Sequence, residues 1–282
     1  AGATALTLGG RAQAQTTTFT DADVLNFALN LEYLEAQFYS FAAFGAGLST
    51  TLTASGGGTA GGTVTGGKQV TFTDPIVAQY AREIAADEVA HVGFLRSALG
   101  VAAVAMPNID ISATGAFTSA ALAAGVIAAG GTFDPYASDE NFLLGAFIFE
   151  DVGVTAYKGA SILLNSALYL DAAAGILAVE AYHAGLVRTA LYAKGLALPS
   201  LRTQAGQISD ARDSLDGASD LDQGIIGTAT ASNITPADGN GLAFTRSAGQ
   251  VLNIVYLNKN AVVGGGFFPN GVNGNIKTSA AN

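Results

Sequence analysis

The chain has 282 residues and no cysteine, which allows one large domain with a substantial core and excludes disulfides, thiol catalysis and cysteine metal ligands. Half of the residues are hydrophobic and only 12% are charged, against about a quarter in typical soluble domains, as suits an exported protein or an assembly subunit. The formal net charge of −10 argues against a nucleic-acid partner, and no apolar run reaches the roughly 18 residues that a transmembrane segment needs.

The first residues resemble the end of a targeting signal. Residues 1–15 are mostly small and apolar, and they end near Ala12-Gln13-Ala14, which resembles an A-x-A signal-peptidase site. We therefore interpret residues 1–19 as the remnant of an export signal with an N-terminal arm. An ordinary disordered N-terminus is the alternative. Export predicts a periplasmic or extracellular location in a bacterium.

Four long amphipathic helices are predicted from helical periodicity and capping residues. Thr20 precedes the first helix and Gly45 follows it, while Asp74-Pro75 is a favourable start for the second. Ser138 opens the third helix, and Asp171 is expected to open the fourth. The expected helices cover residues 20–44, 74–99, 138–168 and 171–194. These helices predict an all-α protein with a four-helix bundle over residues 20–198.

The connections differ strongly from the helices in composition. Residues 45–72 are rich in Gly and Thr, and we predict a long insert there with a hairpin near 64–72. The connector that follows the second helix contains one short helix candidate, 118–129. Residues 199–282 are rich in Gly, Asn, Asp and Ser, which predicts an irregular C-terminal extension packed on the bundle. Its acidic residues lack the spacing of an EF-hand, so a solvated loop is expected for Asp210, Asp213, Asp216, Asp220 and Asp222.

One helical motif occurs twice. Residues 88–99 and 180–191 both read Glu-x-x-His-x-Gly-x-x-Arg-x-Ala-Leu, and they contain the only two histidines of the chain, His91 and His183. Residues three apart share a helix face, so each histidine lies beside its glutamate, Glu88 or Glu180. We expect Gly93 and Gly185, two residues after each histidine, to allow close helix packing.

The other two long helices repeat a second pattern. Glu32 is followed seven residues later by Tyr39, and Glu150 by Tyr157, so each tyrosine lies two turns beyond its glutamate on the same face. The glutamates of the repeats lie in apolar stripes, where an unpaired carboxylate is prohibitively costly. Four converging carboxylates would balance two divalent cations, with two neutral imidazoles completing the set. Arg96 and Arg188 each follow their histidine by five residues, which places them on a different face of the helix.

This arrangement resembles the ferritin-like di-iron and di-manganese carboxylate proteins, in which two helices each supply a Glu and two supply a Glu-x-x-His. The segment Leu29-Asn30-Leu31-Glu32-Tyr33-Leu34-Glu35-Ala36-Gln37-Phe38-Tyr39 is similar to the exported branch that includes plant desiccation-related proteins. The resemblance covers residues 20–195 and implies a ferritin-like four-helix bundle with two Fe or Mn ions. The implied metal ligands are Glu32, Glu88, His91, Glu150, Glu180 and His183. Two carboxylates would bridge the metal ions, and the sequence does not decide whether they are Glu88 and Glu150 or Glu88 and Glu180.

The chain departs from this family's pattern. Several of its members place an Asp before each Glu-x-x-His to hold the histidine of the other helix. Asp87 keeps this residue, whereas Val179 replaces it, so one histidine needs another orienting partner, Asp151 or a tyrosine. Tyr39 and Tyr157 are expected as hydrogen-bonded core residues beside the ligands. Snorkelling or ion pairing is expected for the remaining acids considered, Glu35, Glu83 and Asp151.

Two functions remain open from the sequence. The first is a di-iron or di-manganese oxidase, peroxidase or catalase that reacts with oxygen or peroxide in stress protection. The second is a non-enzymatic stress or structural protein that uses the bundle as a scaffold, and the low charge and Gly/Asn-rich tail favour self-association into a homo-oligomer or surface assembly. The long insert and the tail argue against a spherical iron-storage cage.

Overall fold

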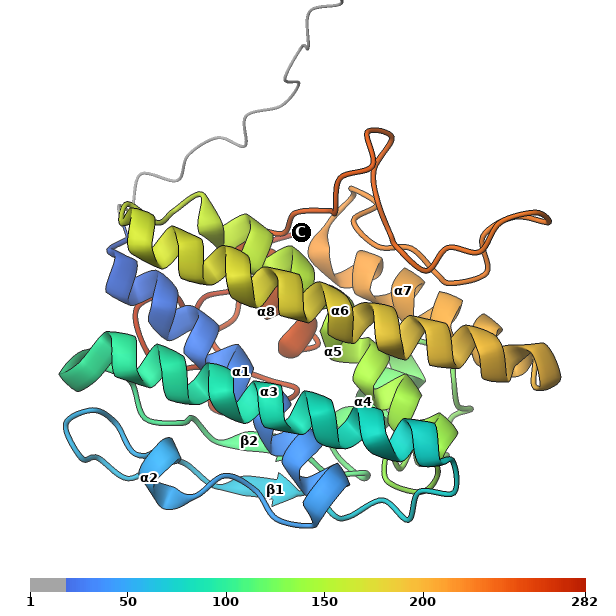
Figure 1. Cartoon of the computed structure of the whole chain (residues 1–282), viewed down its shortest axis with the longest axis horizontal. Coiled ribbons are helices and arrows are strands. Elements are labelled where there is room, and N and C mark those ends of the chain that lie inside the picture. Colours follow the sequence, from blue (N-terminus) through green and yellow to red (C-terminus); the bar gives the residue numbers. More distant parts are fainter. Residues whose placement is uncertain (1–18) are drawn as a thin grey trace, which may run out of the picture.

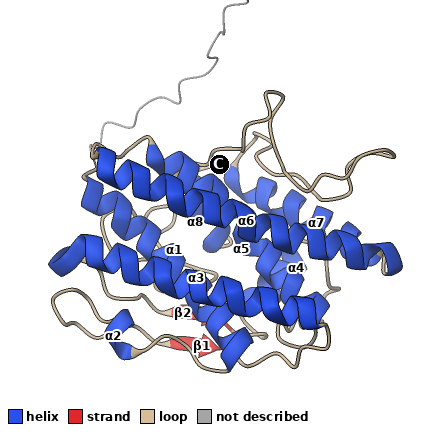
Figure 2. Ribbon diagram, viewed as in Figure 1, coloured by secondary structure: helices blue, strands red, loops and turns tan. Residues whose placement is uncertain are grey.

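A computed structural model describes residues 19–282, so the predicted export signal lies outside the described residues. Helices dominate the described chain, with one pair of short strands at its edge (Figures 1 and 2). The bundle consists of α1 (Asp21–Phe44), α3 (Pro75–Leu99), α5 (Asp139–Ser161) and α6 (Ala167–Ala197). Its closest pairings are α1 with α3 and α5 with α6. The all-α, ferritin-like bundle that the sequence predicts is confirmed.

Capping residues explain most helix limits. The Thr20 side chain accepts a hydrogen bond from the Asp23 amide and forms a capping box, and Gly45 ends α1 with φ 75°. Asp74 caps α3, ahead of Pro75. The prediction was wrong between the last two helices. A break at residues 162–166 separates α5 from α6, and Ser166 rather than Asp171 caps α6, which adds a turn before the predicted start.

The insert and the connector meet along one edge of the bundle. The insert contains α2 (Thr50–Thr53) and β1 (Val64–Gly66), and the connector contains a 3-10 turn (Gly100–Ala102), β2 (Ile109–Ile111) and α4 (Ala116–Ala123). The predicted hairpin is wrong, because β1 pairs in parallel with β2, Val64 opposite Ile109. The apolar residues near 64–72 therefore include a strand, but its partner β2 follows α3 in the sequence instead of lying next to β1.

The C-terminal extension begins with a helix that its composition does not reveal. α7 (Ser200–Asp216) packs against α5 and α6, and α8 (Ala248–Val255) packs against α5 and α7, while the rest of 217–282 is irregular. The expected solvated loop is wrong for Asp210, Asp213 and Asp216, which lie on α7, and Asp216 and Asp222 are buried rather than solvated. These two buried acids belong to a network of buried charges that joins the bundle to the extension, formed by Asp151, Arg188, Arg212, Asp216, Asp222 and Arg246.

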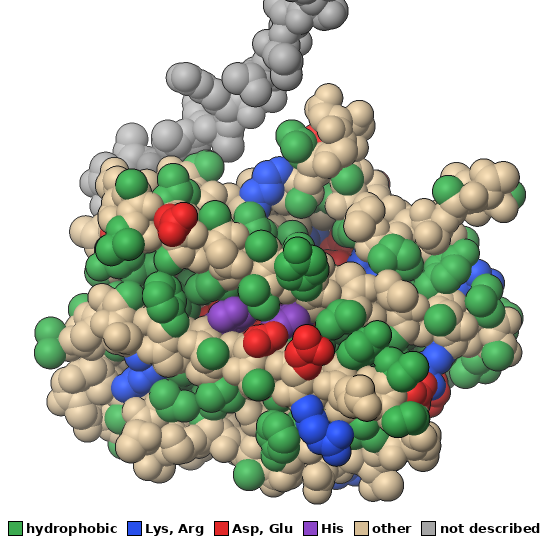
Figure 3. All heavy atoms as spheres, in the orientation of Figure 1, with side chains coloured by type: hydrophobic (Ala, Val, Ile, Leu, Met, Phe, Trp, Pro, Cys, Tyr) green, Lys and Arg blue, Asp and Glu red, His purple; other side chains and the backbone are tan. Residues whose placement is uncertain are grey.

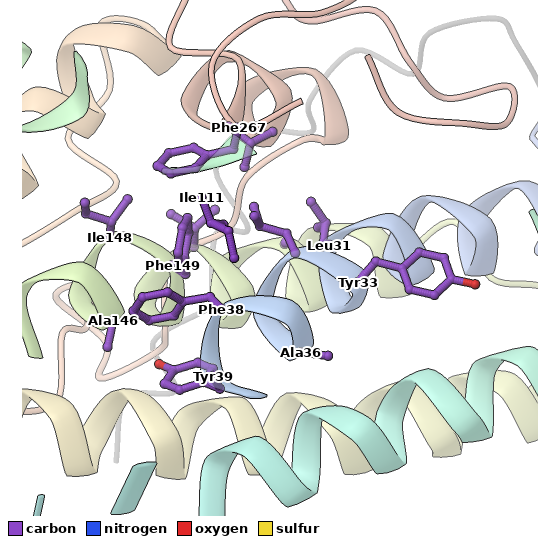
Figure 4. Close-up of a cluster of buried hydrophobic side chains, with 14 of the residues drawn as sticks. Leu31, Tyr33, Ala36, Phe38, Tyr39, Ile111, Ala146, Ile148, Phe149 and Phe267 are labelled. Carbon is purple, nitrogen blue, oxygen red and sulfur yellow. The ribbon is translucent and has the colours of Figure 1, made fainter. Parts of the chain in front are cut away.

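Aromatic side chains anchor the extension in the core. Phe149, the residue before Glu150, lies 4.9 Å from Phe267 between ring centroids and 5.6 Å from Phe38 (Figure 4). Phe267 is fully buried although it lies in an irregular segment. Such contacts add to the stabilisation from apolar burial and hold α5 in place beside α1. The extension thus forms part of the core around the centre of the bundle.

The arginine of each repeated motif anchors a different added segment. Arg96 donates to the Tyr33 hydroxyl at 2.7 Å and to carbonyls of the insert, Thr51 and Ala54. Arg188 donates to the Asp151 carboxylate at 2.7 Å and to four carbonyls of the extension. Tyr33 and Asp151 occupy equivalent positions, each following a glutamate of the bundle. Neither arginine reaches the histidines, in agreement with their predicted helix faces.

Among the described residues, α6 is the one helix whose length and composition would suit a membrane span. One third of its most apolar stretch is buried in the protein. This helix packs along α5 and directs Glu180 and Arg188 into the protein interior. It is therefore one of the four helices of the bundle, and residues 19–282 contain no clear transmembrane segment.

Candidate metal centre

The structure brings all six sequence-predicted ligand residues together in the middle of the bundle. α1 supplies Glu32 and α5 supplies Glu150, whereas α3 and α6 each supply a Glu-x-x-His pair from one helix face. Every one of them is buried, with exposures between 0% and 8%. Oxygen and nitrogen atoms of these residues form two groups compact enough to hold a metal ion, Glu32, Glu88, His91 and Glu180 in the first and Glu150, Glu180 and His183 in the second.

The first group surrounds the Nδ1 atom of His91. This nitrogen lies 3.2 Å from Glu32 Oε2, 3.6 Å from Glu88 Oε2 and 3.7 Å from Glu180 Oε1. The carboxylates thus come from three helices and converge on one imidazole nitrogen. We refer to this group as the His91 position.

The second group surrounds the Nδ1 atom of His183, and we refer to it as the His183 position. Here Glu88 Oε1 lies at 3.0 Å and Glu150 Oε2 at 3.8 Å. Glu180 belongs to both groups, and the two oxygens of Glu88 face different histidines. Of the two bridging pairs that the sequence left open, this geometry favours Glu88 with Glu180.

The polar atoms of the centre lack the partners that buried groups normally have. Eight of their buried oxygen and nitrogen atoms form no hydrogen bond of acceptable geometry in the described chain, although each histidine Nδ1 atom lies within 3.2 Å of a carboxylate oxygen. They are Glu32 Oε2, Glu88 Oε1 and Oε2, His91 Nδ1, Glu150 Oε2, Glu180 Oε1 and Oε2, and His183 Nδ1. Native interiors contain few such atoms, so a cluster of eight requires an explanation. All of them are atoms that commonly bind metals, and they face one another, which is the arrangement that metal ions would satisfy.

Electrostatics supports the same conclusion. Burial raises the pKa of Glu88 and Glu180 well above the usual carboxyl value, and neighbouring carboxylates raise it further. Burial likewise raises the pKa of Glu150 to about 8. Without a cation these groups are therefore held in the neutral form, whereas metal binding requires them ionised. Metal binding would release protons from the site and relieve the repulsion among its carboxylates.

The two tyrosines cross between the helix pairs. Tyr39 of α1 donates to Glu150 of α5, and Tyr157 of α5 donates to Glu32 of α1. Each hydroxyl thus holds one carboxylate oxygen and leaves the other facing the centre. The tyrosines are hydrogen-bonded core residues, as the sequence predicts. Each holds the glutamate of the other helix rather than that of its own.

The outer nitrogens of the two histidines differ in their surroundings. His183 Nε2 lies 3.1 Å from Asp87 Oδ2, so Asp87 holds the histidine of the other helix as predicted. Neither Asp151 nor a tyrosine replaces it for His91, because Asp151 pairs with Arg188 and Arg212 and both core tyrosines bind glutamates. His91 instead lines a groove, and Val179, the residue at the position equivalent to Asp87, lies in the same wall.

This groove lies between α3 and α6 with His91 in its lining, and the space-filling view shows histidine atoms in the middle of this face of the molecule (Figure 3). It has a volume of about 630 Å³, and its walls are mainly apolar, with Phe94, Ala98, Leu168 and Ile176 among them. A small molecule would therefore reach the centre from the side of His91.

Sequence reasoning missed one residue and misjudged two others. Glu35, assigned to snorkelling or ion pairing, is 5% exposed and lies among the carboxylates of the centre. Helical spacing from Glu32 places it on nearly the same face, a signal that could have found it. Gly93 and Gly185 do not mediate close packing, because a Cβ atom at either position would meet no atom within 4 Å. Glu83 is exposed and Asp151 is ion-paired, as expected.

The fold and these residues define a ferritin-like protein. The ferritin-like domain family matches residues 20–193, and the chain belongs to this family. It is 29% identical over 268 residues to the ferritin-like catalase Nec2 of Nesocodon mauritianus, a match that covers 91% of this chain and 84% of the relative. It is 31% identical over 248 residues to the desiccation-related protein PCC13-62 of Craterostigma plantagineum, covering 83% of this chain and 76% of the relative.

Proposed function

We propose that this protein binds two divalent metal ions, Fe or Mn, and reacts with peroxide or oxygen at that centre to protect against oxidative stress. The cluster of eight unpartnered donor atoms carries the proposal. Its ligands would be Glu32, Glu88, His91, Glu150, Glu180 and His183, with Glu88 and Glu180 as bridges. Carboxylate and imidazole donors suit both Fe and Mn, and four carboxylates balance the charge of two divalent ions.

Bound metal ions would supply the redox chemistry and polarise the oxidant. The residues of the chain hold the ligands in place, exclude water and leave a route for the oxidant. Glu88 and Glu180 tie the two positions together, while Tyr39 and Tyr157 limit the movement of Glu150 and Glu32. The aromatic core behind Glu150 excludes water from that side. The groove at His91 leaves one direction of approach.

Peroxide disproportionation is the reaction that we favour. Two molecules of hydrogen peroxide give one of oxygen and two of water, so peroxide serves as both oxidant and reductant and no organic co-substrate is required. The relative named a ferritin-like catalase supports this choice. We also propose export, on the basis of the A-x-A-like pattern at Ala12-Gln13-Ala14.

A non-enzymatic stress protein is the second candidate. The relative named a desiccation-related protein supports it, as do the low charge and the Gly/Asn-rich extension, which favour a homo-oligomer or a surface assembly. In that case the metals would have a structural role in the bundle.

Metal analysis and oxidant turnover distinguish these candidates. We expect two Fe or Mn ions per chain in protein purified from its own source, and oxygen release at half the rate of peroxide consumption. His91→Ala and His183→Ala should each remove a metal ligand and lower turnover by at least about 100-fold. Full metal occupancy without turnover of either oxidant would support the structural role instead. Less than one metal ion per chain would contradict the dinuclear centre itself.

A further inference from the structure

Glu35 is a fifth buried carboxylate beside the four of the centre. It follows Glu32 by three residues on α1, so both side chains extend from one side of that helix toward α5 and α6. Among the described residues, no lysine or arginine forms an ion pair with Glu35. A buried carboxylate without a cation is costly, and its retention requires a reason.

The space around Glu35 depends on Gly153. Gly153 follows Glu150 by three residues on α5 and therefore occupies the position equivalent to Glu35 in the other helix pair. A Cβ atom at residue 153 would lie 2.4 Å from Glu180 Oε2 and 3.5 Å from Glu35 Oε1. No real Cβ atom approaches an oxygen as closely as 2.4 Å. The carboxylates of Glu180 and Glu35 thus border a space that a side chain at residue 153 would enter only by displacing Glu180.

Glu35 also interacts with the carboxylates of the centre. Burial raises its pKa well above the ordinary value, and the charges of Glu150 and Glu32 raise it further. Glu35 is in turn the charged neighbour with the largest effect on Glu180. These interactions involve carboxylates of both metal positions, so the geometry at Gly153 rather than the charges indicates which position Glu35 approaches.

The two oxygens of Glu180 have different neighbours. Oε1 lies 3.7 Å from His91 Nδ1, whereas Oε2 lies at the space beside Gly153 that Glu35 Oε1 also borders. We propose that Glu35 is a further carboxylate ligand of the metal ion at the His183 position, and that Gly153 keeps open the space through which its carboxylate approaches Glu180. This inference rests on the proposed dinuclear centre.

The proposal makes the two ions unequal. An ion at the His183 position would have Glu35 as an additional oxygen ligand, and Asp87 holds its histidine. An ion at the His91 position would have neither, and it faces the groove. We therefore expect the His183 position to bind its metal more tightly, and the ion at the His91 position to be the first that a chelator removes.

Titration of chelator-stripped full-length protein with Mn(II) tests this inference, with affinities from calorimetry and stoichiometry from elemental analysis. The wild type is expected to bind two ions in distinguishable steps. Glu35→Gln keeps the shape of the side chain but removes its charge, and it should weaken the tighter step by about tenfold or more while the weaker step changes little. Glu83→Gln, which removes an exposed acid of α3, is the matched control and should leave both steps unchanged.

Gly153→Ala and the melting temperature of the metal-free protein complete the experiment. Gly153→Ala should weaken the same step as Glu35→Gln, because the added methyl group displaces Glu180 Oε2. Metal-free Glu35→Gln should melt at or above the wild-type temperature at neutral pH, since folding raises the pKa of Glu35 and therefore requires it to be protonated in the interior at a cost in free energy. Wild-type affinities in Glu35→Gln, or equal losses at both steps with a lower metal-free melting temperature, would overturn the inference. If the wild type binds less than one ion, the dinuclear centre itself fails.

Discussion

The two helix pairs of the bundle carry the same motif but surround it differently. In both, a glutamate and a Glu-x-x-His converge near a histidine Nδ1 atom. Outside this shared set, Asp87 corresponds to Val179, and Glu35 corresponds to Gly153. Asp87 and Glu35 lie on α3 and α1, yet both serve the His183 position of the other pair. The duplication thus provides two positions, and single neighbouring residues make them different.

The same contrast extends to the segments added around the bundle. Arg96 binds the insert through two carbonyls and the neutral Tyr33 hydroxyl, and it is half-buried. Arg188 is fully buried and binds the carboxylate of Asp151 together with the extension. The two equivalent arginines therefore bind the added segments at sites that are buried to very different extents. The extension depends on buried charges, whereas the insert lies nearer to solvent.

Replacing these arginines should give the largest difference between the halves. Arg188→Met leaves Asp151 with one fewer cation in the interior, and we expect the free energy of unfolding to fall by about 3–5 kcal/mol. Arg96→Met leaves no buried charge behind and should cost about 1–2 kcal/mol. Denaturant unfolding of both variants measures the difference. Equal losses would contradict the deeper role of Arg188.

Changing the residue before each Glu-x-x-His should alter the metal affinities. Asp87→Asn removes the carboxylate that holds His183, and the affinity of the His183 position should fall by about 10–100-fold. Val179→Asp introduces a carboxylate into the groove wall beside His91 and should tighten the His91 position. Mn(II) titration measures both. An unchanged affinity in Asp87→Asn would mean that packing alone orients His183.

The glycines of the motif should show the smallest effect. Gly93→Ala and Gly185→Ala add a methyl group where no atom lies within 4 Å, in helices where alanine is preferred over glycine. Each should raise the free energy of unfolding by about 0.5–1 kcal/mol and leave metal binding unchanged. Thermal melting and metal analysis check this. A loss of stability in either variant would restore the close-packing role expected from the sequence.

The sequence alone determined the bundle and the six residues at its centre. Capping at Thr20 and Asp74, helical periodicity and the duplicated Glu-x-x-His are local features, and helix geometry converts their spacing into shared faces. Apolar stripes around the glutamates then require that the carboxylates meet inside. The asymmetry between Asp87 and Val179 could also be read directly from the two copies.

Contacts between distant segments decided the rest. The pairing of β1 with β2, the burial of Asp216 and Asp222 against Arg246, and the cross-bonding of the tyrosines join segments whose meeting no local pattern encodes. Glu35 belongs to the same class, because its environment depends on the absence of a side chain at Gly153 on another helix. The spacing of residues in the sequence shows which face of a helix a residue occupies. Only the packing of the helices determines which residues of other segments contact that face.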